Sequence, residues 1–397
     1  MVIENLNIPV VNHLKHLEYV SKINDSNSFN RIDIIDALKG YAIILVILGH
    51  IIVFLDPNNF KDSILFTLIY SFHMPLLFVL SGYLVYGKSI NPIWAFIAKK
   101  FKGLFIPYLI WNIIGLLIVD FFWIKQDLTL KVFETFYIYS NLWFLPVLFF
   151  SFLLLILFIF LEKFSLTWIG QNFSVFFYLI SYLIIMWLLV DQPPFQGFLP
   201  IRWFFPFVFV GYIIAKYKDY IFNFENRLFL ISLFLFPILL PFWDIRIIQF
   251  ADVGFIRLLT SFVLALSGII LSYYVIKLLK NTKIYDFFTL CGEFSLEIYI
   301  ISNILGLFSQ ITNINFWFGD GIISLLSGTL IFLFFSLTLS LIFSYNKSCS
   351  TLLFGRWVLK HSPSNIKYHL FFLSIALIYI YVSSILLNIS KTLVLLH

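Results

Sequence analysis

Charged residues are scarce in this sequence. Only 12% of its residues are Asp, Glu, Lys or Arg, whereas 61% are hydrophobic. Soluble domains carry about 25% charged residues, because charge keeps their surfaces hydrated. A chain of 397 residues with so little charge cannot cover a water-facing surface. The shortage excludes a soluble globular protein and indicates that lipid surrounds most of the chain.

Cysteine is scarce as well, with Cys291 and Cys349 as the two examples. Two cysteines provide neither a disulfide framework nor a cysteine-based metal site, so we expect no disulfide and no metal. The formal charge of +6 is not a nucleic-acid signal, because the few basic residues are dispersed between hydrophobic runs. We therefore expect membrane lipid, and no nucleic acid, as a partner.

Long hydrophobic runs take the place of charge. Backbone polar groups in lipid must be satisfied within a helix or a closed barrel. Barrel strands alternate apolar and polar residues over roughly ten positions, whereas these runs are continuous over about twenty, the length of a membrane-spanning helix. The sequence predicts an all-α polytopic membrane protein of about ten or eleven spans with no soluble domain. The expected spans lie near 34–55, 63–86, 104–123, 142–161, 173–190, 200–215, 228–243, 255–276, 287–308, 321–343 and 370–389.

Three regions follow from this pattern. Residues 1–30 are polar and lack the apolar core of a cleavable signal, so they predict a cytoplasmic extension. Residues 31–343 form the transmembrane core, and residues 344–397 add a cytoplasmic loop and a probable extra transmembrane helix. Lys and Arg concentrate in the loops on the side of the N-terminus, which predicts a cytoplasmic N-terminus in a multi-pass protein of the cell membrane.

The first expected span contains three ionisable residues, Asp36, Lys39 and His50. Such residues are costly in a membrane and usually face a protein interior or a wet cavity. Lys39 and His50 are eleven residues apart, which is roughly 16 Å along a helix and within about 20° of one face. They predict a cavity with a cation near its mouth and an imidazole deep inside. The structural alternatives are a snorkelling lysine and a histidine that joins two helices.

The second expected span contains His73, Pro75 and the small pair Ser81–Gly82. Proline frees a backbone carbonyl and small residues let helices approach closely, so this span suits a cavity wall. A packing kink with one structural histidine explains the same pattern. The loop after it carries Lys99, Lys100 and Lys102, which fit either a lipid-facing basic patch or a landing site for an anionic cofactor.

Two later spans carry further charge. Arg202 lies at an expected outer end of the sixth span, where an interfacial anchor is the plain alternative to a functional role. Glu293 and Glu297 in the ninth span are spaced i,i+4, which predicts that both carboxylates share one face of a helix.

Several stretches resemble the membrane-bound acyltransferase-3 family, and within it the sugar O-acetylase branch typified by fucose 4-O-acetylases. The matching stretches cover roughly residues 31–343, and the first two are the specific ones. Many members place a histidine shortly after the last stretch, where this chain has Ser302. The stretches are DALKGYAIILVILGH, IYSFHMPLLFVLSGYL, KKFKGLFIPYLIW, LWFLPVLF, the weaker FPFVFVGYII and CGEFSLEIYI.

The resemblance implies an enzyme that moves an acetyl or other short acyl group from acyl-CoA to a hydroxyl. The acceptor would be a cell-surface glycan or its lipid-linked precursor, and acetyl-CoA the donor. His50 is the candidate base, or a transient acyl carrier. Lys39 would attract the donor phosphates or hold the charge balance of the site, and Asp36, three residues earlier, is expected to pair with Lys39. Lys99, Lys100 and Lys102 would bind the nucleotide end of acyl-CoA. Residues expected to line the donor and acceptor cavity are His73, Ser81, Tyr41, Trp143, Glu297 and Arg202.

Other classes of membrane protein also bury Lys, His and Glu. A secondary transporter or a glycolipid flippase is the main alternative, although it would more often show inverted repeats or paired broken helices. A glycan polymerase would be expected to have a long, basic external loop, and the stretch near 124–141 is too short and too mixed in charge.

Overall fold

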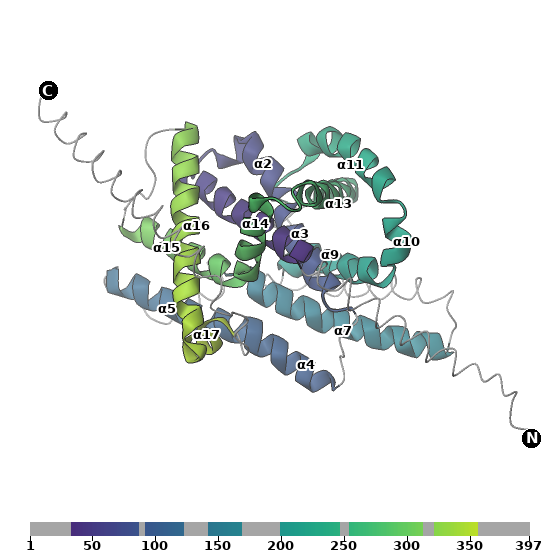
Figure 1. The fold of residues 1–397 in the computed structure, drawn as a ribbon, viewed down its shortest axis with the longest axis horizontal. Helices are drawn as coiled ribbons and strands as arrows, with labels where there is room; N and C mark the ends of the chain where they lie inside the picture. Colours follow the sequence, from purple (N-terminus) through teal and green to yellow (C-terminus); the bar gives the residue numbers. More distant parts are fainter. Residues whose placement is uncertain are drawn as a thin grey trace, which may run out of the picture.

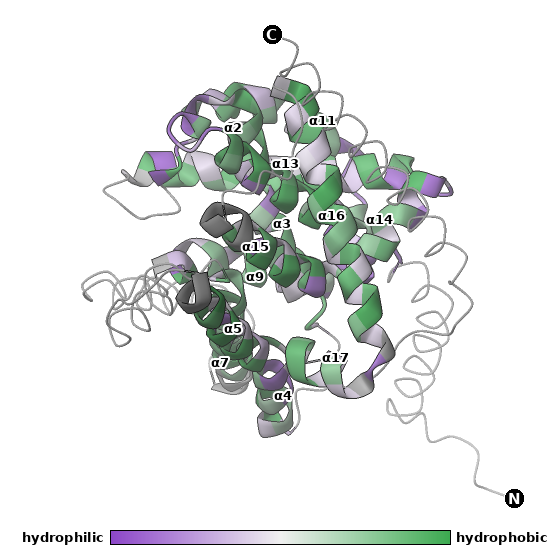
Figure 2. Ribbon diagram, turned by 90° about the vertical axis from the view of Figure 1, so that its left-hand side faces the viewer, coloured by the Kyte–Doolittle hydropathy of each residue, from purple (hydrophilic) through white to green (hydrophobic). Residues whose placement is uncertain are grey.

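The computed structural model describes residues 33–86, 92–122, 142–168, 199–246, 254–312 and 321–355. Within these ranges the regular elements are helices and none is a strand, which confirms the predicted all-α membrane fold. Six of these helices are long and apolar enough to cross a membrane, and the number rises to seven if one bent pair counts as a span. Figure 2 shows that hydrophobic residues cover most of the labelled helices.

The described part of the chain starts with a helix, Asp33–Leu55, which we call the first helix, and continues through short and long helices, most of which Figure 1 labels. Two of the short segments are 3-10 turns and η2 is a π-helical turn. The elements after the first helix are η1 (Phe60–Asp62), α2 (Ile64–Tyr70), α3 (His73–Tyr83), α4 (Ile93–Lys100), η2 (Phe101–Phe105), α5 (Ile106–Phe122), α7 (Phe144–Trp168), α9 (Leu199–Lys216), α10 (Lys218–Phe222), α11 (Glu225–Leu239), η4 (Leu240–Phe242), α13 (Phe255–Leu278), α14 (Lys283–Glu293), α15 (Ser295–Thr312), α16 (Gly321–Tyr345) and α17 (Lys347–Phe354).

Most of the expected spans correspond to these helices. The six long helices and the bent pair coincide with expected spans near 34–55, 63–86, 104–123, 228–243, 255–276, 287–308 and 321–343. The expected spans near 142–161 and 200–215 correspond to α7 and α9. The spans expected near 173–190 and 370–389, and the N-terminal extension, lie outside the residues that the structure describes.

Glycines bring two pairs of helices into backbone contact. A Cβ at Gly40 in the first helix would overlap the carbonyl oxygen of Phe288 in α14, and a Cβ at Gly292 in α14 would overlap the carbonyl oxygen of Asp36. The same reciprocal arrangement joins α3 and α9 through Gly82 and Gly211. Small residues permit this close approach, which favours helix association in lipid. These two crossings fix the positions of the first helix and α3.

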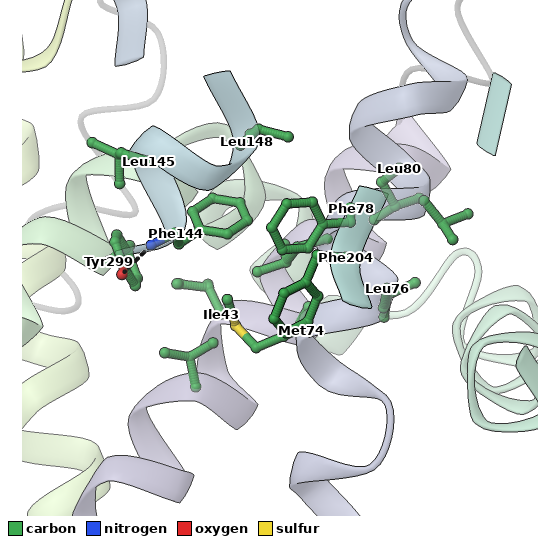
Figure 3. Packing of buried hydrophobic residues seen from close by; sticks show 14 of the residues in the cluster. Ile43, Met74, Leu76, Phe78, Leu80, Phe144, Leu145, Leu148, Phe204 and Tyr299 are labelled. Atoms are coloured by element: carbon green, nitrogen blue, oxygen red, sulfur yellow. Dashed lines mark hydrogen bonds between the residues drawn. The ribbon is translucent and has the colours of Figure 1, made fainter. Parts of the chain in front are cut away.

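Aromatic side chains fill the space between α3, α7, α9 and α15 (Figure 3). Phe78 stacks on Phe204 with ring centroids 4.6 Å apart. The rings of Phe144 and Phe78 meet edge-on, with centroids 5.0 Å apart. The backbone N–H of Phe144 donates to the hydroxyl of Tyr299 at 3.4 Å. Tyr299 belongs to the SLEIYI stretch, so this contact ties the start of α7 to α15.

The peripheral helix α11 differs from this interior. It packs mainly on α13 and lies at the margin of the helix assembly in Figure 1. Exposed apolar side chains cover its outer face, including Leu230, Leu233 and Phe234. An apolar surface of this kind is typical of a helix face that contacts lipid. An exposed ion pair between Lys277 of α13 and Glu225, 2.7 Å long, ties the first turn of α11 to its neighbour.

Two details of the sequence-based prediction are wrong. Glu293 and Glu297 do not share a helix face, because α14 ends at Glu293 and the chain bends by 76° before α15 begins at Ser295. The Lys99–Lys102 stretch is not a loop either. It lies within a continuous helical segment, Ile93–Ile118, because lysine is a good helix former and its apolar neighbours extend the span.

Candidate functional site

The Asp36–Lys39 pair lies near the start of the first helix. The Lys39 ammonium nitrogen is 2.9 Å from the Asp36 carboxylate, which confirms the predicted pairing. Asp36 is buried, and its backbone carbonyl contacts Gly292 of α14. Since an isolated charge would be costly at this position, the pair lets both ions remain inside the helix assembly. Its position at a helix crossing also holds Lys39 in place.

His50 lies toward the other end of the same helix. Protein surrounds this residue, yet its side chain keeps partial accessibility. Its ring lies 6.3 Å from the ring of Phe54. Among the residues that the structure describes, none forms a hydrogen bond or an ion pair with the imidazole. Within the described part of the chain the ring nitrogens thus have no protein partner, which is unusual for a polar group inside a membrane protein.

His73 occupies a break in the second span. Helix α2 ends at Tyr70 and α3 begins at His73, since Pro75 cannot donate a hydrogen bond to the carbonyl of Ser71. The Nδ1 of His73 is 2.7 Å from the carbonyl oxygen of Ile69. A carbonyl only accepts, so Nδ1 carries the proton and donates it. In the neutral ring this contact leaves Nε2 as an acceptor. His73 therefore caps the end of α2 and has a fixed tautomer.

Tyr70 joins the two histidines, and the sequence-based prediction missed it. Its ring meets the ring of His73 edge-on at 4.8 Å and stacks on Phe66 at 3.9 Å. A Cβ at Gly49, the residue before His50, would lie only 2.7 Å from the ring carbon Cε2 of Tyr70. The sequence signal that could have identified Tyr70 is its position three residues before His73 in the IYSFHMP stretch.

His50, His73 and Tyr70 form one group, which we call the imidazole–tyrosine cluster. The two imidazoles lie within electrostatic range of each other, and Tyr70 lies within the same range of Tyr299. Tyr70 is partly accessible and, like His50, has no hydrogen-bond partner among the described residues. The cluster thus contains one imidazole and one phenol that no described residue pairs with.

Tyr41 and Ser81 are not brought to this cluster. Tyr41 is nine residues from His50, which places it on the opposite face of the first helix. Its ring meets Phe288 edge-on at 5.9 Å and its hydroxyl contacts Ser272. The hydroxyl of Ser81 donates to the carbonyl of Leu77 in its own helix at 2.7 Å. Both residues contribute to helix packing.

Trp143, Arg202 and Glu297 lie around the Phe144–Tyr299 contact. The Trp143 ring is 5.1 Å from the ring of Phe204, two residues beyond Arg202. Glu297 is buried in the first turn of α15, two residues before Tyr299. Trp143 therefore packs into the aromatic core, and Arg202 and Glu297 lie in helices that contribute Phe204 and Tyr299 to the same core.

The three lysines of the basic stretch diverge. Lys99 and Lys102 are exposed, whereas Lys100 lies 3.7 Å above the ring of Phe152. The π-helical turn η2, Phe101–Phe105, follows directly. Because Lys100 is held by a cation–π contact, the three lysines do not form one basic cluster, and Lys99 is exposed.

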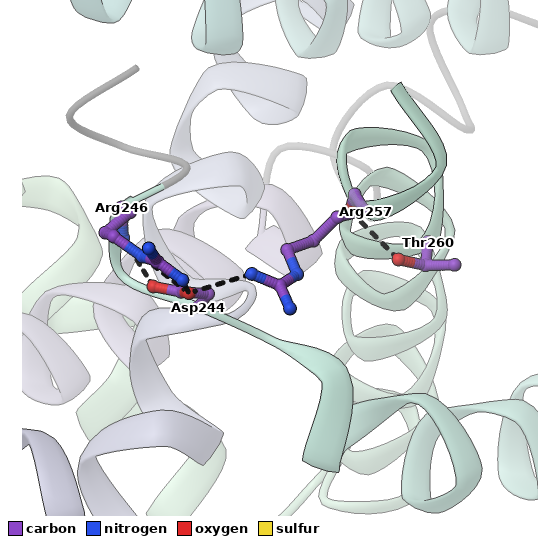
Figure 4. Close-up of polar contacts among 4 residues, drawn as sticks. All are labelled: Asp244, Arg246, Arg257 and Thr260. Carbon is purple, nitrogen blue, oxygen red and sulfur yellow. Dashed lines mark hydrogen bonds and ion pairs between the residues drawn. The ribbon is translucent and has the colours of Figure 1, made fainter. Parts of the chain in front are cut away.

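A charged loop lies beyond the end of α11 (Figure 4). The Asp244 carboxylate accepts hydrogen bonds from Arg246 at 2.6 and 2.8 Å, and Arg257 approaches it at 3.3 Å. The hydrogen bonds from Arg246 lower the pKa of Asp244 below its ordinary value. All three side chains are satisfied by one another, so this group is explained by anchoring the loop to the start of α13.

Side chains that could bind a metal ion do not gather in the described part of the chain. Among the described residues, no group of three or more His, Cys, Asp or Glu side chains could hold a metal ion. The chemistry that this part of the molecule offers is therefore that of imidazole, phenol, carboxylate and ammonium groups.

Comparisons with known proteins point to one family. The sequence profile described as acyltransferase domain matches residues 32–345. The nodulation protein NolL of Sinorhizobium fredii is 39% identical to this chain over 80 residues, a stretch that covers 19% of this chain and 22% of that protein. No solved structure matches the chain. The profile match includes the first helix, α3, α14 and α15, and so the whole of the imidazole–tyrosine cluster.

Proposed function

Since this chain belongs to the acyltransferase 3 family and is a membrane acyltransferase, we propose that it moves an acetyl group from acetyl-CoA to a sugar hydroxyl. The acceptor is a cell-surface glycan or its lipid-linked precursor. The observation that carries the proposal is His50, a partly accessible imidazole within the helix assembly that has no hydrogen-bond or ion-pair partner among the described residues. A structural histidine would be hydrogen-bonded, as His73 is.

In the proposed reaction His50 acts as the general base. It takes the proton of the acceptor O–H while that oxygen attacks the thioester carbonyl carbon. The new C–O bond forms, the C–S bond breaks, and the imidazolium returns the proton to the departing thiolate of coenzyme A. The net result is an acetyl ester and free coenzyme A. Imidazole suits both proton transfers because its unperturbed pKa of about 6.5 lies near working pH.

Tyr70 and His73 support this step in different ways. The phenol of Tyr70 has no hydrogen-bond partner among the described residues, so it is free to donate to the oxygen on which negative charge develops. His73 holds the edge of the Tyr70 ring and caps α2, which fixes the position of the phenol relative to His50. His73 is thus a positioning residue.

The Asp36–Lys39 pair marks the donor side. We place the N-terminus and this end of the first helix in the cytoplasm, where acetyl-CoA is made, and place the chain in the cell membrane. Lys39 is roughly 16 Å from His50 along the helix axis. The thioester of acetyl-CoA is at the end of a long flexible arm. Lys39 can therefore attract the phosphates while the thioester reaches His50. Lys99 and Lys102 of the basic stretch would add to this attraction.

A labelling experiment tests this function. Wild type, His50→Gln and the control Tyr274→Phe are expressed at matched levels in membranes, and labelled acetyl-CoA is supplied from the cytoplasmic face. Label in extracted glycan or lipid-linked sugar is expected with wild type and control, and its loss is expected with His50→Gln. Equal label with His50→Gln would remove His50 from the chemistry. Absence of label with folded wild type and the host's own glycans would refute the acetyl-to-sugar assignment.

A further inference from the structure

A cavity lies apart from the imidazole–tyrosine cluster, and none of the three cluster residues lines it. It has a volume of about 480 Å³ and is bounded by the first helix, α3, the α9–α11 segment and α13. On the first helix it touches Ile34, Ile35 and Leu38, on the side of the molecule where that helix begins. A volume of this size is in the range of small-molecule sites, about 300–1,000 Å³. We call it the α11 groove.

The α11 groove is separated from the proposed reaction site. Leu38 precedes His50 by twelve residues, which is roughly 18 Å of helix. Between them, the side chain of Phe72 packs against Gly268 of α13, where a Cβ would lie 2.6 Å from Phe72. Phe72 in turn meets Phe236 of α11 edge-on at 5.9 Å. These contacts lie beside the groove, next to its lining residue Ile269 in α13 and near the break in the second span.

The lining of the groove is predominantly apolar. Leu76, Val79 and Ile269 are buried residues that form its inner wall, and Leu228 of α11 forms part of its outer wall. Because α11 is peripheral and its other face is exposed, the groove lies between a lipid-facing helix and the helix interior. Water in such a space would gain few hydrogen bonds, whereas a hydrocarbon chain fills it favourably.

The polar end of the groove carries basic side chains. Lys277 and Lys280 line it together with Glu225, and Lys277 is already paired with Glu225. Lys280 is exposed and forms no ion pair with another described residue, although the carboxylate of Asp33 is near enough to act on it electrostatically. One ammonium group is therefore open at the point where the apolar lining ends.

An apolar channel that ends at an open ammonium group is complementary to a chain that ends in a phosphate. We propose that the α11 groove binds a glycerophospholipid from the leaflet that contains the start of the first helix. One acyl chain lies between α11 and the inner wall, and the headgroup phosphate contacts Lys280. α11 packs mainly on α13, and the lipid would connect it across the groove to the first helix and α3.

Lipid binding to designed variants tests this inference. The purified full chain is stripped of lipid in mild detergent, and phosphatidylglycerol is added back and counted on the intact protein by native mass spectrometry. Leu228→Trp fills the groove, whereas Leu230→Trp places the same side chain on the exposed face of α11 and serves as its control. Lys280→Ala removes the phosphate contact, and Lys283→Ala removes an exposed lysine outside the groove.

One tightly held lipid is expected on the wild type and on both controls. Its affinity should fall about tenfold in Leu228→Trp and several-fold in Lys280→Ala, in line with the loss of a packed chain or a single charge contact. Equal lipid occupancy in Leu228→Trp and Leu230→Trp would refute the groove as the site. Stoichiometric displacement of the lipid by palmitoyl-CoA would overturn the proposal as well, because the groove would then belong to the acyl donor. Variants that elute as monodisperse protein with wild-type melting temperatures are compared.

Discussion

The two ends of the first helix treat their ionisable residues differently. At one end Lys39 and Asp36 neutralise each other at 2.9 Å, beside a glycine crossing. Near the other end His50 is just as enclosed, but no described neighbour forms a hydrogen bond with it. A buried polar group is ordinarily satisfied, because leaving it unpaired costs free energy. This difference supports the proposal that the ligand's reacting groups bind at His50 while Lys39 holds charge.

The largest effect is expected from removing the unpaired imidazole. His50→Gln keeps a polar side chain of similar size but cannot carry a proton between acceptor and thiolate. The rate of acetyl transfer should fall about 100- to 10,000-fold, the usual contribution of a general base. Initial rates in membranes with matched amounts of protein measure the change. A loss of less than about threefold would contradict the role of His50 as base.

The next largest effect is expected at the crossing between the first helix and α14, which lies beside the Asp36–Lys39 pair. Gly292→Ala should place a Cβ on the carbonyl oxygen of Asp36 and force the first helix away from α14. Overpacking of this kind costs about 1–3 kcal/mol, which exceeds the helix propensity that alanine gains. Thermal unfolding in detergent should show a lower melting temperature. Gly115→Ala is the control, because its nearest neighbour would be 3.6 Å away, and an equal melting temperature in both variants would contradict the close crossing.

The contribution of the Asp36–Lys39 pair to activity can be measured separately from its contribution to stability. Lys39→Gln leaves the Asp36 carboxylate buried without its partner, so both activity and stability should fall. In the double variant Asp36→Asn with Lys39→Gln the unpaired charge is gone. We expect its melting temperature to recover while acetyl transfer stays about 10- to 100-fold low, since the ammonium group that attracts the donor phosphates is lost. Recovery of activity together with stability would show that the pair is structural.

A smaller effect is expected at Tyr70. Tyr70→Phe keeps the ring that contacts His73 and Gly49 and removes only the hydroxyl. If the phenol donates to the developing oxyanion, kcat should fall about tenfold or more, with the melting temperature unchanged. Tyr274→Phe removes a hydroxyl that donates to Asn226 outside the site and should leave kcat unchanged. Wild-type kcat in Tyr70→Phe would exclude the phenol from the reaction.

The smallest effect is expected in the charged loop, where every group is paired. The hydrogen bonds that lower the pKa of Asp244 stabilise the folded state only while the carboxylate is ionised. Asp244→Asn should therefore lower the melting temperature slightly at neutral pH. The difference from wild type should vanish as the pH falls below the ordinary carboxylate value of 3.8. A difference that persists at low pH would contradict an ionic origin. Acetyl transfer should not change in either condition.

The sequence predicted the fold class because the bilayer imposes it. Continuous apolar runs of about twenty residues leave the helix as the solution, and their positions predicted the long helices in the described ranges. The Asp36–Lys39 pair was predictable for a similar reason, since residues three apart on a helix are neighbours. Local periodicity is sufficient for such features.

Features that depend on a break or on a neighbouring helix were not predictable in this way. The bend at Phe294 separates Glu293 from Glu297, although a continuous helix would have aligned them. Tyr70 reaches the cluster because α2 ends there and Gly49 of another helix admits its ring. Tyr41 belongs to a conspicuous stretch of sequence, yet it points away from His50. In each instance tertiary packing decided the outcome.

The most direct test of these assignments compares kcat and KM between variants at the two ends of the first helix. His50→Gln and the double variant of Asp36 and Lys39 are reconstituted, and kcat and KM for acetyl-CoA are measured with saturating acceptor. The account predicts that His50→Gln lowers kcat with little change in KM, and that the double variant mainly raises KM for acetyl-CoA. The reverse pattern, with KM altered at His50 and kcat lost at the ion pair, would contradict the assignment of chemistry to one end and donor binding to the other.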